Sequence, residues 1–173
     1  NIQDTTELDF NGRQTAGLGP LSYEAQRGMY LHPTYAVSPQ REPLGVLDAW
    51  MWAREPRDAD GVRGGIKESE RWIEGYERVA ERALELPQVR QVVVADREAD
   101  ILALLVRARE LNHAADYLIR CQHDRALPEG GKLWARMAQA PQLGRVVFDL
   151  PPGRGRQARR VTQSLRADVI ELA

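Results

Sequence analysis

The sequence has little of what marks a secreted or membrane-spanning protein. It contains a single cysteine, Cys121, which excludes a disulfide within the chain, and a solitary thiol suits a reducing cytosol. No apolar run approaches the roughly 20 residues of a membrane-spanning helix. His32, His113 and His123 show no ligand spacing with the cysteine, so the sequence gives no sign of a zinc site. We therefore expect a cytoplasmic protein without a membrane partner.

Lysine is nearly absent, because 22 of the 24 basic residues are arginine. Arginine suits bidentate contacts with phosphate, although a GC-rich genome produces the same excess. The net charge of −1 conceals an uneven distribution. Residues 1–100 hold 12 basic and 18 acidic side chains, whereas residues 101–173 hold 12 and 7. The positions of the charges are therefore more informative than their total.

Hydrophobic periodicity predicts an α/β chain. Three strands that could form an antiparallel meander are followed by a helix, a strand, a second helix and another strand. The strand between the helices is almost continuously apolar, which is typical of a strand buried in a parallel sheet. The predicted ranges are 2–10, 29–37 and 44–53 for the meander, then helix 67–86, strand 89–95, helix 98–111 and strand 117–122. Cys121 alternates with apolar residues of the last strand, so we expect its thiol in the core.

The predicted pattern of helices and strands changes after residue 125. A short helix is predicted over 133–138, with strands over 146–150 and 161–165 and the start of another over 169–172. The two strands are joined by a segment rich in proline, glycine and arginine.

Two aspartates stand directly after apolar strand sequences, 92 residues apart. Asp4 follows Ile2-Gln3, and Asp96 follows Val92-Val93-Val94-Ala95. Carboxylates on the ends of buried strands are hard oxygen ligands on stiff supports, which is what a Mg²⁺ site for phosphoryl transfer requires. Alternatively, Asp4 is a turn residue and Asp96 caps the helix that follows it.

Both aspartates lie in segments that resemble a known family. Asp96-Arg97-Glu98-Ala99-Asp100 resembles the second catalytic box of bacterial cut-and-paste DDE transposases of the DREAD-motif insertion-sequence family, and Ile2-Gln3-Asp4-Thr5-Thr6 resembles their first box. Weaker similarities extend over nearly the whole chain. They comprise Lys67-Glu68-Ser69 with Arg71-Trp72, the strand Tyr117 to His123, and Ala158-Arg159-Arg160 with Ser164-Leu165-Arg166.

The resemblance implies an RNase H-like catalytic core over residues 1–125 and the beginning of a β-rich insertion over 126–173. In that fold Asp4 and Asp96 stand on adjacent strands and hold two Mg²⁺ ions, for which Mn²⁺ can substitute. Asp4 contacts both ions and Asp96 contacts one. The implied activity is metal-dependent DNA cleavage and strand transfer at transposon ends. The implied partners are transposon and target DNA and a second subunit, in the bacterial cytoplasm.

One part of the family pattern is missing. Family members carry a third acid, a glutamate within Tyr-x₂-Arg-x₃-Glu on a late helix, and no such run occurs here; Glu171 is the last acid. We therefore expect a transposase fragment with two of three catalytic carboxylates, inactive by itself. The alternatives are a degenerate remnant that only binds DNA and another RNase H-like nuclease.

Six arginines are candidate DNA contacts. Arg97 is expected either to contact phosphate or to form a surface ion pair. Arg120 resembles a family arginine near the bound DNA end, and the alternative is an ion pair with a neighbouring acid. A basic loop between two predicted strands suits phosphate contacts without sequence readout, or is simply a solvated hairpin tip. Its members are Arg154, Arg156, Arg159 and Arg160.

Overall fold

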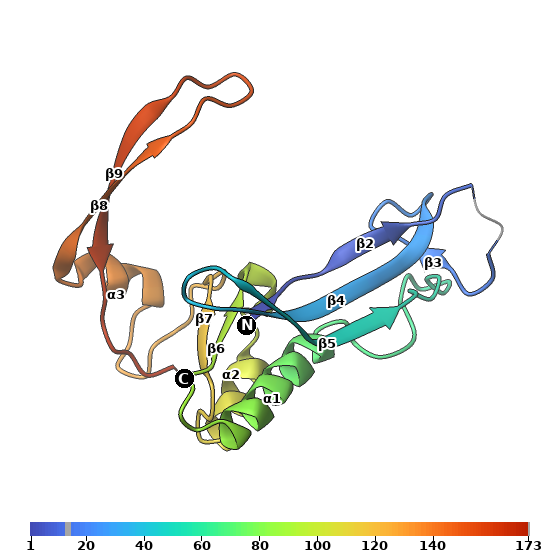
Figure 1. The fold of residues 1–173 in the computed structure, drawn as a ribbon, viewed down its shortest axis with the longest axis horizontal. Coiled ribbons are helices and arrows are strands. Elements are labelled where there is room, and N and C mark those ends of the chain that lie inside the picture. Colours follow the sequence, from blue (N-terminus) through green and yellow to red (C-terminus); the bar gives the residue numbers. More distant parts are fainter. Residues whose placement is uncertain (13–14, 173) are drawn as a thin grey trace. The chain divides into compact units, whose positions relative to one another are not determined.

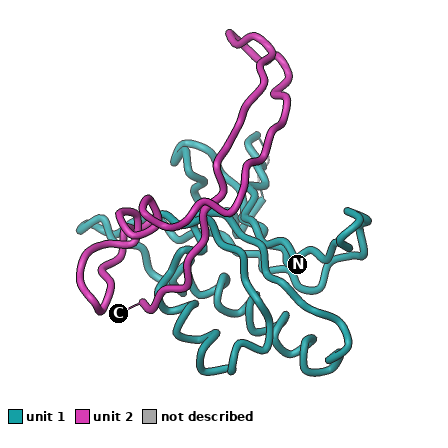
Figure 2. Tube along the Cα trace, turned by 90° about the vertical axis from the view of Figure 1, so that its left-hand side faces the viewer, with its two compact units in different colours: residues 1–122 teal, residues 123–173 magenta. Residues whose placement is uncertain are grey.

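The structure, a computed structural model, describes residues 1–12 and 15–172. The chain divides into two compact units, Asn1–Gln122 and His123–Ala173 (Figure 2). This division lies three residues before the boundary at 125/126 that the sequence suggests.

The first unit is built around one mixed sheet (Figure 1). Tyr35 of β4 pairs with Ile2 of β1 on one side and with Val46 of β5 on the other. The strands therefore run across the sheet in the order β5, β4, β1, β6, β7, with β2 and β3 also paired to β4. The pairs β1–β6 and β6–β7 are parallel, and β4 is antiparallel to each of its partners. The strands are β1 (Ile2–Gln3), β2 (Thr6–Asp9), β3 (Gly19–Pro20), β4 (Arg27–Val37), β5 (Pro43–Trp52), β6 (Val92–Ala95) and β7 (Asp116–Ile119).

The strand predicted over 2–10 forms as two pieces, β1 and β2, that share one register against β4. Gln3 pairs with Thr34 and Thr6 with Leu31, so no residue is inserted between them. The interruption falls at residues 4 and 5, where the backbone N–H of Thr5 donates to the side chain of Asp4. The first aspartate therefore lies at the break between the two strands β1 and β2.

Two helices cover one face of this sheet (Figure 1). They are α1 (Glu70–Glu85) and α2 (Leu102–Glu110). The apolar stripe of α1 is buried at Trp72, Tyr76 and Val79, as its helical spacing predicts. These side chains form one core with residues of β6 and α2, including Val93 and Leu104. The predicted α/β class is confirmed: the described residues form a mixed sheet with three α-helices.

The second helix begins later than the sequence predicts. Residues Arg97–Ala99 form a single 3₁₀ turn, and α2 starts only at Leu102. Ile101 between them is extended, with φ −109° and ψ 126°. The Asp100 side chain is buried and accepts a hydrogen bond from the backbone N–H of Gln122 at 2.6 Å. This contact ties the turn to the chain beyond β7 and replaces a continuous helix.

The expected position of Cys121 in the core is wrong, because Cys121 is exposed. Strand β7 ends at Ile119, so the alternation that would have turned the thiol inward stops two residues earlier.

The second unit contains a short helix and a long hairpin. The helix is α3 (Leu133–Gln139), and β8 (Gln142–Leu150) pairs antiparallel with β9 (Arg159–Arg166). The strand expected over 169–172 does not form. The Asp168 side chain accepts from the N–H of Val169 at 2.9 Å and pairs with Arg136, so this segment hydrogen-bonds locally. None of the helices in the described residues is long and apolar enough to span a membrane.

Candidate metal and DNA site

Asp4 and Asp96 each come directly after the last residue of a strand, and the two strands are parallel neighbours. Gln3, the last residue of β1, pairs with Ala95, the last residue of β6, and each is followed by an aspartate. Paired strands lie about 4.8 Å apart, so the two carboxylates start from adjacent positions at one edge of the sheet. Asp4 is exposed, and the Asp96 side chain keeps 43% of its surface exposed. Both side chains are therefore open to solvent and to a ligand.

Each carboxylate already has partners within the protein. Asp4 accepts from the backbone N–H of Thr5 at 2.8 Å. Asp96 accepts from the N–H of Glu98 at 2.8 Å through Oδ1, and its Oδ2 lies 3.6 Å from the Arg120 guanidinium. Asp96 thus caps the 3₁₀ turn after β6, the local role that its sequence position also allowed. Such contacts fix the direction of a carboxylate, and they leave lone pairs for a cation.

The arginines near this edge differ in their contacts. Arg120 is largely exposed and pairs with Asp96. It therefore forms the ion pair with a neighbouring acid that the sequence allowed, and this pair also places it beside the candidate site. Arg97 is exposed and makes no ion pair with any residue that the structure describes. Arg97 is therefore available for a contact with phosphate.

A buried polar network supports the segment after Asp4. The Thr5 hydroxyl lies 2.8 Å from Nδ1 of His32 and accepts from Nε of Arg71 at 3.4 Å. Nε2 of His32 lies 3.4 Å from Oε1 of Gln3. Burial, together with the charge of Arg71, lowers the pKa of His32 to about 4. The imidazole is thus neutral at pH 7 and holds the residues on both sides of Asp4.

Only a weak signal for this network is visible in the sequence. His32 alternates with Tyr30 and Thr34 on the buried face of β4, which predicts burial of the imidazole but not its partners. Arg71 belongs to the family-like segment after Lys67, although nothing in its spacing links it to Thr5.

Arg71 continues the network toward β5. Its guanidinium lies 4.1 Å from the centre of the Trp52 ring and 3.7 Å from Glu68. Glu68 is hydrogen-bonded through both oxygens to Arg54, whose guanidinium lies 4.0 Å over the ring of Tyr30. Burial raises the pKa of Glu68, but the hydrogen bonds and charge of Arg54 outweigh it and hold the pKa below its usual value. Arg54, Glu68 and Arg71 are therefore charged, and their mutual contacts hold the side chains in place.

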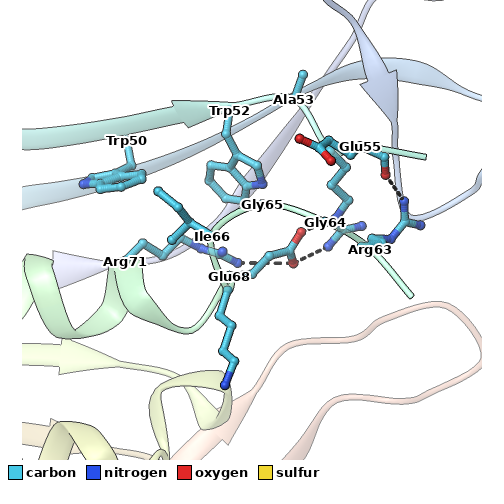
Figure 3. Close-up of a pocket in the computed structure, with 12 residues that line it drawn as sticks. Trp50, Trp52, Ala53, Glu55, Arg63, Gly64, Gly65, Ile66, Glu68 and Arg71 are labelled. Carbon is cyan, nitrogen blue, oxygen red and sulfur yellow. Dashed lines mark hydrogen bonds and ion pairs between the residues drawn. The ribbon is translucent and has the colours of Figure 1, made fainter. Parts of the chain in front are cut away.

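These residues border a cavity of about 270 Å³ between the end of β5 and residues 63–67 (Figure 3). Trp50, Trp52 and Ile66 supply much of its apolar lining, and Arg71 and Glu68 lie at its polar side. Arg71 belongs both to the lining of the cavity and to the network beside Asp4, because the same guanidinium also contacts Thr5.

The four loop arginines lie in the second unit, Arg154 and Arg156 in the turn of the β8–β9 hairpin and Arg159 and Arg160 at the start of β9. All four are exposed, and none makes an ion pair with a described residue. The hairpin turn is closed by an isolated bridge between Gly153 and Arg156. The four charges, at residues 154, 156, 159 and 160, are thus presented to solvent.

Within residues 1–12 and 15–172, no group of three or more acidic, histidine or cysteine side chains is arranged to hold a metal ion. No protein-family model matches the chain. A search of curated proteins found no match either.

Proposed function

We propose that the first unit is the catalytic core of a DDE transposase, which cleaves and joins DNA by metal-dependent phosphoryl transfer. The observation that carries this proposal is the pairing of Gln3 with Ala95, which brings Asp4 and Asp96 to adjacent positions at one sheet edge. Two exposed carboxylates in this arrangement fit a pair of hard divalent cations about 3.5–4 Å apart.

The sheet order supports the RNase H-like part of the proposal. The order β5, β4, β1, β6, β7, with β4 antiparallel to the rest, agrees with the fold that the transposase resemblance implies. The helices α1 and α2 lie between β5 and β6 and between β6 and β7, as such an order requires.

The residues present suit Mg²⁺ or Mn²⁺ in chemistry. Such ions activate an attacking oxygen and stabilise the leaving 3′ oxygen. Asp4 and Asp96 would hold these ions, and the family resemblance implies that Asp4 would contact both ions and Asp96 one. Arg120, paired with Asp96, would meet the negative charge of the DNA strand. Thr5, His32 and Gln3 hold the backbone around Asp4.

A second candidate function is DNA binding without turnover. Both oxygens of Asp96 already face protein groups, and the described residues supply no third acid beside the pair. A protein of this kind would bind DNA through its arginines but would not bind a divalent ion at Asp4 and Asp96.

Thermal unfolding with and without Mn²⁺ separates the two candidates. Bound metal stabilises the folded state by mass action, by about 2.7 kcal/mol at 100 times its dissociation constant. We expect Mn²⁺ to raise the Tm of the wild-type chain and to raise that of Asp4→Asn or Asp96→Asn much less. Asp60→Asn, which removes an exposed carboxylate elsewhere in the unit, is the matched control. Equal shifts in all four proteins would show that the ion binds elsewhere.

A further inference from the structure

The cavity beside β5 has one aromatic wall, Trp50, on which no ring or guanidinium of the described residues stacks. Trp52 already has two partners, Tyr30 stacked at 5.1 Å with an interplanar angle of 19° and the Arg71 guanidinium over its ring at 4.1 Å. Trp50 is half-buried, and no ring or guanidinium of the described residues stacks on its indole. A planar group that entered the cavity could therefore stack on Trp50.

The lining of the cavity is also suited to an anion. It includes four cationic side chains, Arg54, Arg63, Lys67 and Arg71, against the two acids Glu55 and Glu68, and Arg63 is paired with Glu24 outside the lining. Arg54 and Glu68 neutralise one another through their hydrogen bonds. Lys67 is exposed and makes no ion pair with the described part of the chain. The excess positive charge thus lies next to an aromatic wall.

The cavity is connected through Arg71 to the strand end that carries Asp4. Arg71 is 6% exposed, stacks on Trp52, and donates from Nε to the hydroxyl of Thr5, the residue after Asp4. Arg71 therefore belongs both to the lining of the cavity and to the contacts of the residue after Asp4.

We propose that this cavity binds one unstacked nucleobase of a DNA strand. The base stacks on Trp50 beside Ile66, and Lys67 and Arg71 balance the charge of its phosphate. Stacking on an aromatic side chain accepts any base, so the cavity adds affinity without sequence preference. The inference rests on the proposed action on DNA and names where the strand would be held beside the site.

The test compares two short single strands of equal length and charge by fluorescence anisotropy: an oligodeoxyadenylate and a strand whose internal positions are abasic. Stacking of one base on an aromatic side chain strengthens binding roughly five- to a hundredfold. We expect the wild-type chain to prefer the base-containing strand by a factor in this range. Trp50→Leu should bind both strands alike, at the affinity of the wild type for the abasic strand.

A second pair of variants tests the same cavity in case Trp50→Leu does not fold. Ile66 is 69% exposed at the cavity, and Val62 is 60% exposed in the same segment but does not line it. Ile66→Glu should abolish the preference for the base-containing strand, and Val62→Glu should retain it. Deoxyadenosine monophosphate added as competitor shows whether a free nucleotide fills the same cavity.

The outcomes are distinguishable. Equal binding of both strands by the wild type, or an unchanged preference in Trp50→Leu and Ile66→Glu, overturns the cavity proposal and leaves the proposed function standing. Failure of the wild type to bind either strand overturns both.

Discussion

Gly75 of α1 lies directly against the side chain of Gln3 in β1. A Cβ atom at residue 75 would stand 2.6 Å from Oε1 of Gln3, closer than real contacts allow. Gln3 is 1% exposed and precedes Asp4, so this close approach fixes the strand end that carries the first aspartate. The absence of a side chain at residue 75 is thus part of how the helix positions the candidate site.

Gly75→Ala is therefore expected to destabilise the first unit. Alanine gains up to about 1 kcal/mol in helix propensity, whereas overpacking a core typically costs about 1–3 kcal/mol. We expect the free energy of unfolding, measured in urea, to fall by about 1–2 kcal/mol. In a Gln3→Ala background the same change should stabilise the helix, because the obstructing amide is gone. Destabilisation of equal size in both backgrounds would contradict the contact.

His32 is expected to make stability depend on pH. Its pKa is about 4 in the folded chain, because of burial and the charge of Arg71, and about 6.5 in the unfolded chain. Between these values the unfolded state holds a proton that the folded state lacks. The free energy of unfolding should therefore fall as the pH drops from 6.5 to 4, by up to about 3 kcal/mol. Denaturant titrations at several pH values measure this loss.

The control for this dependence is a neutral side chain at the same place. His32→Gln cannot titrate, so its curve should be flatter by the share that His32 contributes. The same substitution at the exposed His113 provides the matched control. If wild type and His32→Gln lose equal stability on acidification, the loss comes from other groups.

The order of elements and the aspartate pair could be predicted from the sequence, because both follow from local patterns. The stripe of Trp72, Tyr76 and Val79 defines α1, and apolar residues before Asp4 and Asp96 mark the strand ends. The position of β1 beside β6 could be predicted only from the family resemblance, since periodicity does not specify which strands are neighbours.

The rest depended on contacts between distant residues. The bond from Arg71 to Thr5 spans 66 positions, and the ion pair of Arg54 with Glu68 joins the segment after β5 to the segment before α1. The late start of α2 depends on Asp100 reaching Gln122. Local propensity favoured a longer helix there, and tertiary hydrogen bonding outweighed it.

The sheet face opposite α1 and α2 carries a row of apolar neighbours. Val46, Tyr35, Ile2, Val94 and Leu118 stand opposite one another on successive strands. Val46 is 58% exposed and Leu118 65%. Strands of parallel sheets are usually covered on both faces, so this row is an unusual exposed apolar surface.

We expect the exposed row to bind the dye ANS while the chain is fully folded. Val46→Lys with Leu118→Lys should reduce the fluorescence and change the free energy of unfolding by less than about 0.5 kcal/mol for each exposed site. The same pair of lysines at Leu84 and Val169, which are exposed elsewhere, is the control. Unchanged fluorescence in the first pair would place the dye on another surface.

The last prediction concerns the four arginines of the β8–β9 hairpin. They are exposed and carry no ion pair with described residues, so contacts with DNA phosphates would release counterions without reading sequence. Replacing Arg154, Arg156, Arg159 and Arg160 by alanine should make the log–log dependence of duplex affinity on salt less steep, by up to about 3.6 for four contacts.

Replacing the same four residues by lysine separates charge from geometry. Lysine keeps the positive charge but loses the bidentate fork of arginine, so the salt slope should persist while affinity falls at every salt concentration. Titrations of the three proteins over a range of salt, with duplexes of two unrelated sequences, provide the measurement. A wild-type slope retained by the alanine variant would exclude the hairpin as the source of the phosphate contacts. A strong preference for one duplex would instead require side chains that read base edges, which four solvent-exposed arginines at the end of this hairpin do not by themselves provide.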